Sequence, residues 1–416
     1  MNKDVSKNEP ISDYEKIIKK LNWPLWPHFT EQDKNAVEKV IKSNRLFASG
    51  DSKQLFEGSE VKAFEDEFAE YLGIGYARAV GNGTQGLHLA LATLGIGVND
   101  EIITSPYTFI STASCALMQN AVPIFADIEP NSLALSAKKV EEKITQRTKA
   151  IIVIHMLGYP ADVFNIKKVA SKHGLALIED ASHAPGAQYA GKMVGTLGDI
   201  AVFSLHQRKN LCVGDGGIVV TNNEKFASRL YRLRSFGHDE LSYNYRMTEF
   251  AGAIGRTRLQ QLDDENEIRR QNATYLDELL KDIPGITVRK PNPADVGVYY
   301  ALLLEYDQNQ FGVSLDNFIK LVRNEGVPFN RTYTPLHRHP HFNPTSNPAR
   351  GCPWKWKLYD NHHINQTNYK DLKFPVAEEY CDNRLIELPV HPPVGEKEMH
   401  KVYKAVEKVF KLLVSD

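Results

Sequence analysis

The chain has 416 residues, with 50 basic and 51 acidic side chains and a formal net charge of −1. A chain of this length is expected to form two or three domains. Its balanced charge argues against nucleic acid or an anionic membrane as the main partner. The four cysteines are widely spaced without a CxxC pair, and no stretch approaches 18 apolar residues. We therefore expect a cytoplasmic protein without a disulfide framework, a secretion signal or a transmembrane helix.

The sequence divides into three parts. Residues 1–60 are polar and then aromatic, and Trp23, Trp26 and Phe29 predict an N-terminal arm that docks onto another part of the protein. A helix-period pattern begins near Val61 and stops at Gly73, a residue suited to end a helix. We expect a large domain over residues 61–262 and a smaller one over residues 263–416.

Short apolar runs alternate with helix-period segments in the large domain. Strands are predicted at 101–105, 122–128, 150–156, 175–180, 200–205 and 217–221, and helices at about 84–95, 109–118, 136–144, 163–173 and 223–234. Strands that are apolar throughout, with helices between them, are typical of a mainly parallel sheet covered on both faces. The fold class is therefore predicted to be α/β.

A long helical pattern from residue 248 to 281 is suited to connect the two domains. The rest of the chain is rich in proline and histidine, contains alternating fragments such as VYYALLLEY, and closes on an amphipathic helix at 396–413. These features predict a small C-terminal α+β domain.

Three polar features follow predicted strands or turns. Asp180 ends one strand, Lys209 lies on the loop after another, and a Gly-rich turn at 81–86 leads into a helix. Each alone is commonly a cap, a solvated side chain or a simple turn. Together they match pyridoxal phosphate (PLP), which needs a lysine for its aldehyde, a carboxylate for its pyridine nitrogen and a phosphate cup. The amides of Gly83 and Thr84 at a helix N-terminus would form that cup, and Phe109 would stack on the ring.

Several segments in order carry a family resemblance. They are NGTQGLHLALATLGIGVNDEIITSPYTFISTA (82–113), IEDASHAPGAQYAGKMVGTLGD (178–199), FSLHQRKNLCVGDGGIVVT (203–221) and YNYRMTEFAGAIGRTRLQQLD (243–263). The chain resembles the DegT/DnrJ/StrS family of PLP-dependent sugar aminotransferases, which have the fold-type-I architecture. The resemblance is strong to about Leu262 and looser beyond it.

The resemblance implies roles for individual residues. Lys209 would bind the PLP aldehyde, Asp180 the pyridine nitrogen and Ser204 the phosphate. His183 stands where the family usually has a glutamine that faces the ring hydroxyl, and Asn244 would reach the phosphate of the neighbouring subunit. The active unit would then be a homodimer with shared active sites.

The family also implies a reaction: transfer of an amino group from glutamate or glutamine to a keto-sugar, with a nucleotide-linked sugar favoured. Candidate acceptor contacts near TYTPLH are Arg331, Tyr333 and His337. A nucleotide diphosphate would need cations, for which Arg331, His337, Arg338 and Arg246 are available, whereas a cyclitol needs hydroxyl partners such as Tyr333, His183 and Asn330.

Two alternative functions stay open, and a third is disfavoured. His183 and the WPLWPHF segment resemble cyclitol and aminohydroxybenzoate-type aminotransferases of antibiotic pathways, and a non-catalytic PLP-binding regulator is a further possibility. A dehydratase is disfavoured because that branch of the family replaces the lysine with histidine. The HRHPH run lacks an acidic or cysteine partner at recognisable spacing, so no metal is predicted.

Overall fold

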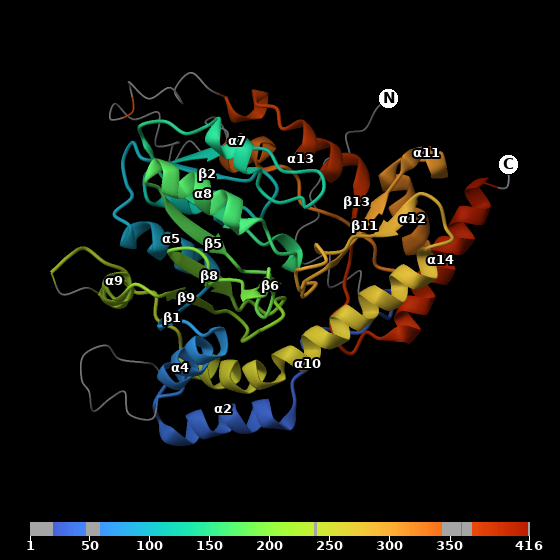
Figure 1. Cartoon of the computed structure of the whole chain (residues 1–416). Coiled ribbons are helices and arrows are strands. Elements are labelled where there is room, and N and C mark those ends of the chain that lie inside the picture. The colour runs from blue at the N-terminus through green and yellow to red at the C-terminus, as the bar shows by residue number, and fades with distance from the viewer. Residues whose placement is uncertain (1–19, 47–58, 237–238, 343–358, 360–367, 415–416) are drawn as a thin grey trace.

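The computed structural model describes residues 20–46, 59–236, 239–342, 359 and 368–414. Within these residues the chain forms a large sheet sandwiched by helices and a small sheet beside it, with one long helix running past both (Figure 1). The predicted α/β class, with a mainly parallel sheet and a smaller antiparallel region, is confirmed.

Seven strands form the large sheet in the described part of the chain, in the order β1-β9-β8-β5-β4-β2-β3. Their bounds are β1 (Tyr76–Val80), β2 (Glu101–Thr104), β3 (Val122–Phe125), β4 (Thr148–Ile154), β5 (Ala176–Asp180), β8 (Ile200–Ser204) and β9 (Gly217–Thr221). The pairs from β8 through β5, β4 and β2 to β3 are parallel, and β9 pairs antiparallel with both β1 and β8. A short hairpin of β6 (Gln188–Tyr189) and β7 (Lys192–Met193) stands apart.

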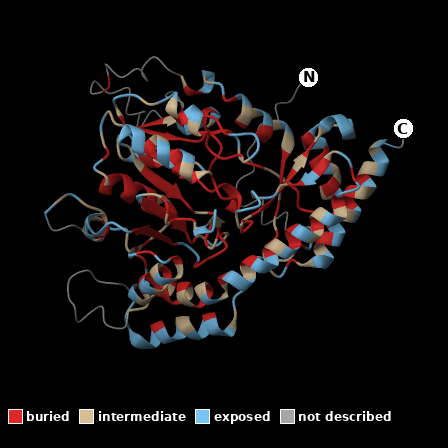
Figure 2. Ribbon diagram, viewed as in Figure 1, coloured by how far each residue is buried: buried red, intermediate tan, exposed pale blue. Residues whose placement is uncertain are grey.

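Both faces of the large sheet are covered, as its apolar strands require. Along β4, Ala150 and Ile152 pack with α5 (Gly83–Thr93) and α6 (Ser111–Met118) on one face. Ile151 and Val153 pack with α8 (Val163–His173) on the other. Because successive side chains of a strand point to opposite faces, a strand buried on both sides reads as one continuous apolar run. Figure 2 shows these central strands as buried.

The helices around this sheet begin and end near the predicted positions. They are α4 (Glu60–Leu72), α5 (Gly83–Thr93), α6 (Ser111–Met118), α7 (Ala137–Glu141), α8 (Val163–His173) and α9 (Glu224–Arg234). Side chains cap several N-termini, and α4 ends at Gly73 with φ +67°, a left-handed conformation that glycine adopts without strain. The caps explain why these boundaries could be read from the sequence.

The long helix α10 (Glu249–Leu280) packs against α4 at its start and against α14 (Glu396–Val414) and β10 (Ile286–Val288) further along (Figure 1). Beside it, four antiparallel strands form the small sheet in the order β10-β11-β13-β12. The elements of this region are β10 (Ile286–Val288), β11 (Leu302–Tyr306), α11 (Gln308–Phe311), α12 (Leu315–Asn324), β12 (Asn330–Arg331), α13 (Pro375–Glu379), β13 (Leu385–Leu388) and α14 (Glu396–Val414). The proposed domain boundary at residue 262 falls inside α10.

The first described residues lie along α10. Residues 21–30 form turns and irregular structure. The helix α2 (Glu31–Ser43) follows them and packs beside α10. This helix was not predicted. Among the described residues no helix is long and apolar enough to cross a membrane. Cys115, Cys212 and Cys381 are buried thiols, and Cys352 lies outside the described residues.

Candidate active site

Lys209 lies in the loop that follows β8, and it is buried with only 9% of its surface exposed. The loop folds back on itself, since the amide of Val213 donates to the carbonyl of Leu205 at 2.9 Å. The Lys209 ammonium nitrogen lies 4.6 Å from the centre of the Tyr300 ring. Burial lowers the pKa of Lys209 to about 7, against the opposing effect of the Asp180 carboxylate. A sizeable fraction of this amine is therefore uncharged at neutral pH.

His183 is stacked on Tyr300, with ring centres 4.3 Å apart and planes at 4°. Its Nδ1 accepts a hydrogen bond from the amide of Leu157 at 3.2 Å, so the neutral ring carries its hydrogen on Nε2. Burial, and then the charge of Lys209, holds the pKa of His183 well below its usual range. The Nε2 atom is buried and has no hydrogen-bond partner within the described chain. His183 thus presents an unused donor at the site.

Asp180 ends β5, next to β8 in the sheet, and is 4% exposed. Its Oδ2 accepts a hydrogen bond from the Thr112 hydroxyl at 2.7 Å, and its Oδ1 accepts one from the Ser182 amide at 3.2 Å. These two donors fix the orientation of the carboxylate. The carboxyl ends of neighbouring strands therefore bring Asp180 and the loop of Lys209 to the same edge of the sheet.

Gly83 is the first residue of α5, after the N-cap Asn82. A Cβ atom at Gly83 would come within 2.8 Å of the Ser204 Cβ, so the helix N-terminus and the end of β8 are in close contact. The Thr84 hydroxyl lies 2.7 Å from the Ser111 hydroxyl at the start of α6. Helix amides and hydroxyls thus gather where a phosphate would be bound.

The wall next to Lys209 is built from aromatic and acidic side chains. The ring centre of Tyr333 lies 6.3 Å from that of Phe109 and 6.3 Å from that of His183. Phe109 is 43% exposed and so has an open face. Glu387 accepts a hydrogen bond from the Thr332 hydroxyl at 2.7 Å. Burial raises the pKa of Glu387 to about 7, partly offset by that hydrogen bond and by the charges of Arg208 and Lys209.

Three predicted residues make polar contacts with other parts of this chain. Asn244 is exposed in the segment beside β1, where its Oδ1 accepts a hydrogen bond from Arg246 at 3.1 Å. Arg331 pairs with Asp316 at 3.0 Å. His337 is buried, and its Nε2 lies 3.1 Å from Glu378. These hydrogen bonds and ion pairs do not involve Lys209, Asp180 or His183.

Sequence reasoning missed several residues of the site. Tyr300 and Glu387 come from the small sheet region, where the sequence gives no motif, and only their place in the fold brings them to Lys209. Thr112 lies in the quoted SPYTFISTA segment, so its contact with Asp180 could have been anticipated. Among the described residues no group of three or more histidine, cysteine or acidic side chains is arranged to hold a metal ion.

The fold is that of fold-type-I aminotransferases, and comparisons with known proteins give the family. The model of the DegT/DnrJ/EryC1/StrS aminotransferase family matches residues 27–364. The chain belongs to this family, and it is an aminotransferase. Members of the family depend on PLP.

Similar proteins act on different acceptors. The chain is 32% identical to the L-glutamine:2-deoxy-scyllo-inosose aminotransferase of Streptoalloteichus tenebrarius over 411 residues, 94% of each chain. It is 31% identical to the GDP-perosamine synthase of Vibrio cholerae over 361 residues, 85% of this chain and 91% of that one. The crystal structure of 3-amino-5-hydroxybenzoic acid synthase matches with a TM-score of 0.79 at 26% identity, covering 93% of this chain and 98% of that one. The family comprises sugar and cyclitol aminotransferases.

Proposed function

We propose that this chain binds PLP through Lys209 and transfers an amino group from glutamate or glutamine to a ketone on a polyhydroxylated ring. The observation that carries the proposal is the buried Lys209, whose pKa of about 7 leaves the amine able to react at neutral pH. The fit to PLP is supported by the fixed carboxylate of Asp180, the unpartnered Nε2 of His183 and the close contact of Gly83 with Ser204.

Bound PLP would supply an aldehyde that condenses with amines and a protonated ring that withdraws electrons from the adjacent carbon. Asp180 would hold the proton on the ring nitrogen, because its carboxylate is already oriented by Thr112 and Ser182. His183 Nε2 would donate to the ring oxygen. The amides of Gly83 and Thr84 and the hydroxyl of Ser204 would bind the phosphate.

Lys209 would act as the general acid–base that moves a proton between the donor carbon and the cofactor. An amine with a pKa near 7 can both accept and return that proton at neutral pH. The stacked rings of His183 and Tyr300 would restrict the access of water to the amine. An assay with each amino acid would identify the amino donor as glutamate or glutamine.

The homodimer expected from the family would complete the phosphate site. Asn244 is exposed in the single chain, as a residue must be if it is to enter a neighbouring subunit. We propose that Asn244 donates to the PLP phosphate of the partner subunit.

The contacts of the basic residues bear on the acceptor class. Arg331 pairs with Asp316, and Arg338 pairs with Asp382 at 2.6 Å and with Glu378 at 3.1 Å. Arg331 and Arg338, two of the cations expected to bind a diphosphate, are therefore already paired with carboxylates, and His337 lies against Glu378. The site wall instead offers the hydroxyl groups of Tyr333 and Tyr300 and the carboxyl of Glu387.

We therefore propose a free cyclitol or related ring as the first candidate acceptor and the nucleotide-linked keto-sugar, which the sequence favoured, as the second. The near full-length similarity to a 2-deoxy-scyllo-inosose aminotransferase supports this order, and the similarity to a GDP-perosamine synthase keeps the nucleotide-linked sugar as the second candidate.

A half-reaction assay separates the two acceptor classes. The protein is first loaded with the amino form of the cofactor, and the return of the aldehyde form is followed by absorbance with each ketone. Faster turnover with a keto-inositol than with nucleotide-linked 3- or 4-keto sugars is expected. The reverse order would favour the nucleotide-linked sugar as the acceptor. Loss of activity with that sugar in Arg331→Ala would then identify Arg331 as a diphosphate contact.

A further inference from the structure

The segment before α2 contacts the loop that carries Lys209. The indole N–H of Trp26 donates a hydrogen bond to the backbone carbonyl of Lys209 at 3.1 Å, across 183 residues of sequence. The amide of Lys209 donates to the carbonyl of His206 at 2.8 Å. Both backbone groups of the lysine are therefore paired, one within its own loop and one by the N-terminal arm.

The Trp26 ring is held in place from three directions. It stacks on His391 with ring centres 4.9 Å apart, and the guanidinium groups of Arg258 and Arg269 each lie 5.0 Å from its ring centre. Arg269 also donates to His391 Nδ1 at 3.1 Å, and Arg258 donates to the carbonyl of His28 at 3.2 Å. The indole thus has a fixed place and direction.

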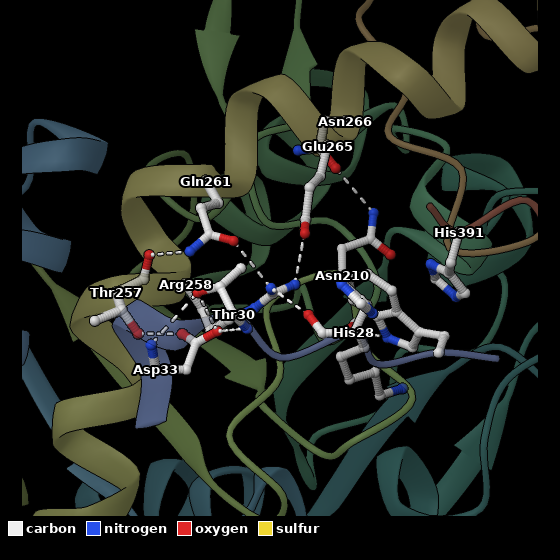
Figure 3. A network of polar contacts seen from close by, with 12 residues as sticks. His28, Thr30, Asp33, Asn210, Thr257, Arg258, Gln261, Glu265, Asn266 and His391 are labelled. Atoms are coloured by element: carbon white, nitrogen blue, oxygen red, sulfur yellow. Dashed lines mark hydrogen bonds and ion pairs between the residues drawn. The ribbon is translucent and has the colours of Figure 1, made fainter. Parts of the chain in front are cut away.

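Figure 3 shows the surrounding network of polar contacts, with Arg258 between the carbonyl of His28 and the carboxylate of Glu265. Asn210, the residue after Lys209, donates from its side chain to Asn266 at 3.1 Å and to the carbonyl of Val298 at 2.8 Å. The loop at residues 209–210 is therefore attached to α10, to the chain before β11 and to the arm.

A line of packed rings connects the arm to the ammonium group of Lys209. His391 lies 5.9 Å from Tyr300 in an edge contact, and Tyr300 is stacked on His183. The Lys209 nitrogen lies over the same Tyr300 ring. Trp26 therefore supports both the backbone of the lysine and the ring against which its amine rests.

We propose that Trp26 is a positioning residue for Lys209, holding the lysine backbone with its indole N–H and the His391–Tyr300 wall with its ring. This inference rests on the proposed role of Lys209. If the N–H is lost, the partly buried carbonyl of Lys209 loses this hydrogen bond, and water that enters to solvate it would also reach the amine. Lys209 would then be less desolvated and less accurately placed for the PLP aldehyde.

The chain offers a matched control in Trp23. Its side chain is also buried in the arm, and its Nε1 has no hydrogen-bond partner in the described part of the chain. Trp23→Phe therefore removes an indole N–H that makes no hydrogen bond to the described residues, and Trp26→Phe removes one that pairs with Lys209. Replacing Trp26 with β-(3-benzothienyl)alanine removes the N–H while keeping the size and shape of the ring, so that variant tests the hydrogen bond if Trp26→Phe fails to fold.

The first readout is the reactivity of Lys209 in the cofactor-free protein. Its acetylation is followed by peptide mass spectrometry against pH, with the exposed Lys149 as an internal reference. The charged and titratable groups around the amine include Asp180, His183, His206, Arg208, Tyr300, Glu387 and His391. All of them are kept in these variants, so a change in midpoint reports the surroundings of the lysine. The second readout is the dissociation constant of PLP.

Both Trp26 variants are expected to raise the labelling midpoint by about one pH unit and to weaken PLP binding roughly tenfold, the effect of leaving one buried acceptor unpaired. Trp23→Phe should leave both quantities at wild-type values. Wild-type values in the benzothienylalanine variant, or an equal change in Trp23→Phe, would overturn the proposal. A wild-type protein that forms no reducible link to PLP at Lys209 would instead overturn the proposed function. The acetylation of the cofactor-free chain does not depend on that function, so the two failures can be distinguished.

Discussion

Replacing Lys209 with methionine should stabilise the cofactor-free chain, most of all at low pH. Burial lowers the pKa of this lysine from 10.5 to about 7, so the folded chain binds the proton less tightly than the unfolded chain does. For a base with a lowered folded pKa, the cost to stability is fully present below that pKa and fades as the pH rises toward 10.5. Each pKa unit corresponds to about 1.4 kcal/mol. The cost is therefore about 5 kcal/mol at pH 6 and about 2 kcal/mol at pH 9.

Urea unfolding of the wild-type and Lys209→Met proteins, both freed of cofactor, measures this difference at the two pH values. The stability gained by Lys209→Met should shrink by roughly 3 kcal/mol from pH 6 to pH 9. Added apolar contacts of the methionine act equally at both values. Lys149→Met, at an exposed position, serves as the control and should show little change with pH. A gain that is the same at both pH values, or a variant less stable than wild type at pH 6, would refute the reasoning.

Three further predictions concern the cofactor site. Asp180→Asn should still bind PLP but transaminate orders of magnitude more slowly, because an unprotonated ring withdraws electrons poorly; near wild-type rates would show that another group holds the proton. Gly83→Ala should weaken PLP binding about tenfold or more, since its Cβ would come within 2.8 Å of Ser204; equilibrium titration tests this, and unchanged affinity would move the phosphate elsewhere. Co-expressed Lys209→Ala and Asn244→Ala chains should regain activity in mixed dimers, and no recovery above the single variants would argue against a shared site.

Much of the large sheet could be predicted because its strands are buried on both faces. The apolar run at 150–156 corresponds to β4, and the run at 217–221 corresponds to β9. The sequence could not show that β9 runs antiparallel to its neighbours. The strand β1 was missed because Tyr76 and Arg78 interrupt its short apolar pattern with partly exposed side chains. Direction and edge pairing depend on contacts between distant residues, which a local pattern does not contain.

The residues of the site also fall into those that the sequence could identify and those that it could not. Residues at the ends of the large-sheet strands, such as Asp180 and Lys209, could be named from motifs and from the rule that ligands bind at the carboxyl ends of strands. Tyr300 and Glu387 could not, because the small sheet brings them to the lysine only after folding. Basic residues near 331–338 looked like substrate contacts in the sequence, and their carboxylate partners Asp316 and Asp382 became visible only in the structure.

The identity of the cofactor-binding lysine is the central claim, and one measurement tests it most directly. The protein is incubated with PLP, reduced with borohydride, digested and mapped by mass spectrometry. We expect the cofactor mass on the peptide that contains Lys209, and we expect Lys209→Ala to lose both this label and the visible absorbance of the bound cofactor. Labelling of a different lysine, or full reducible occupancy in Lys209→Ala, would contradict the assignment.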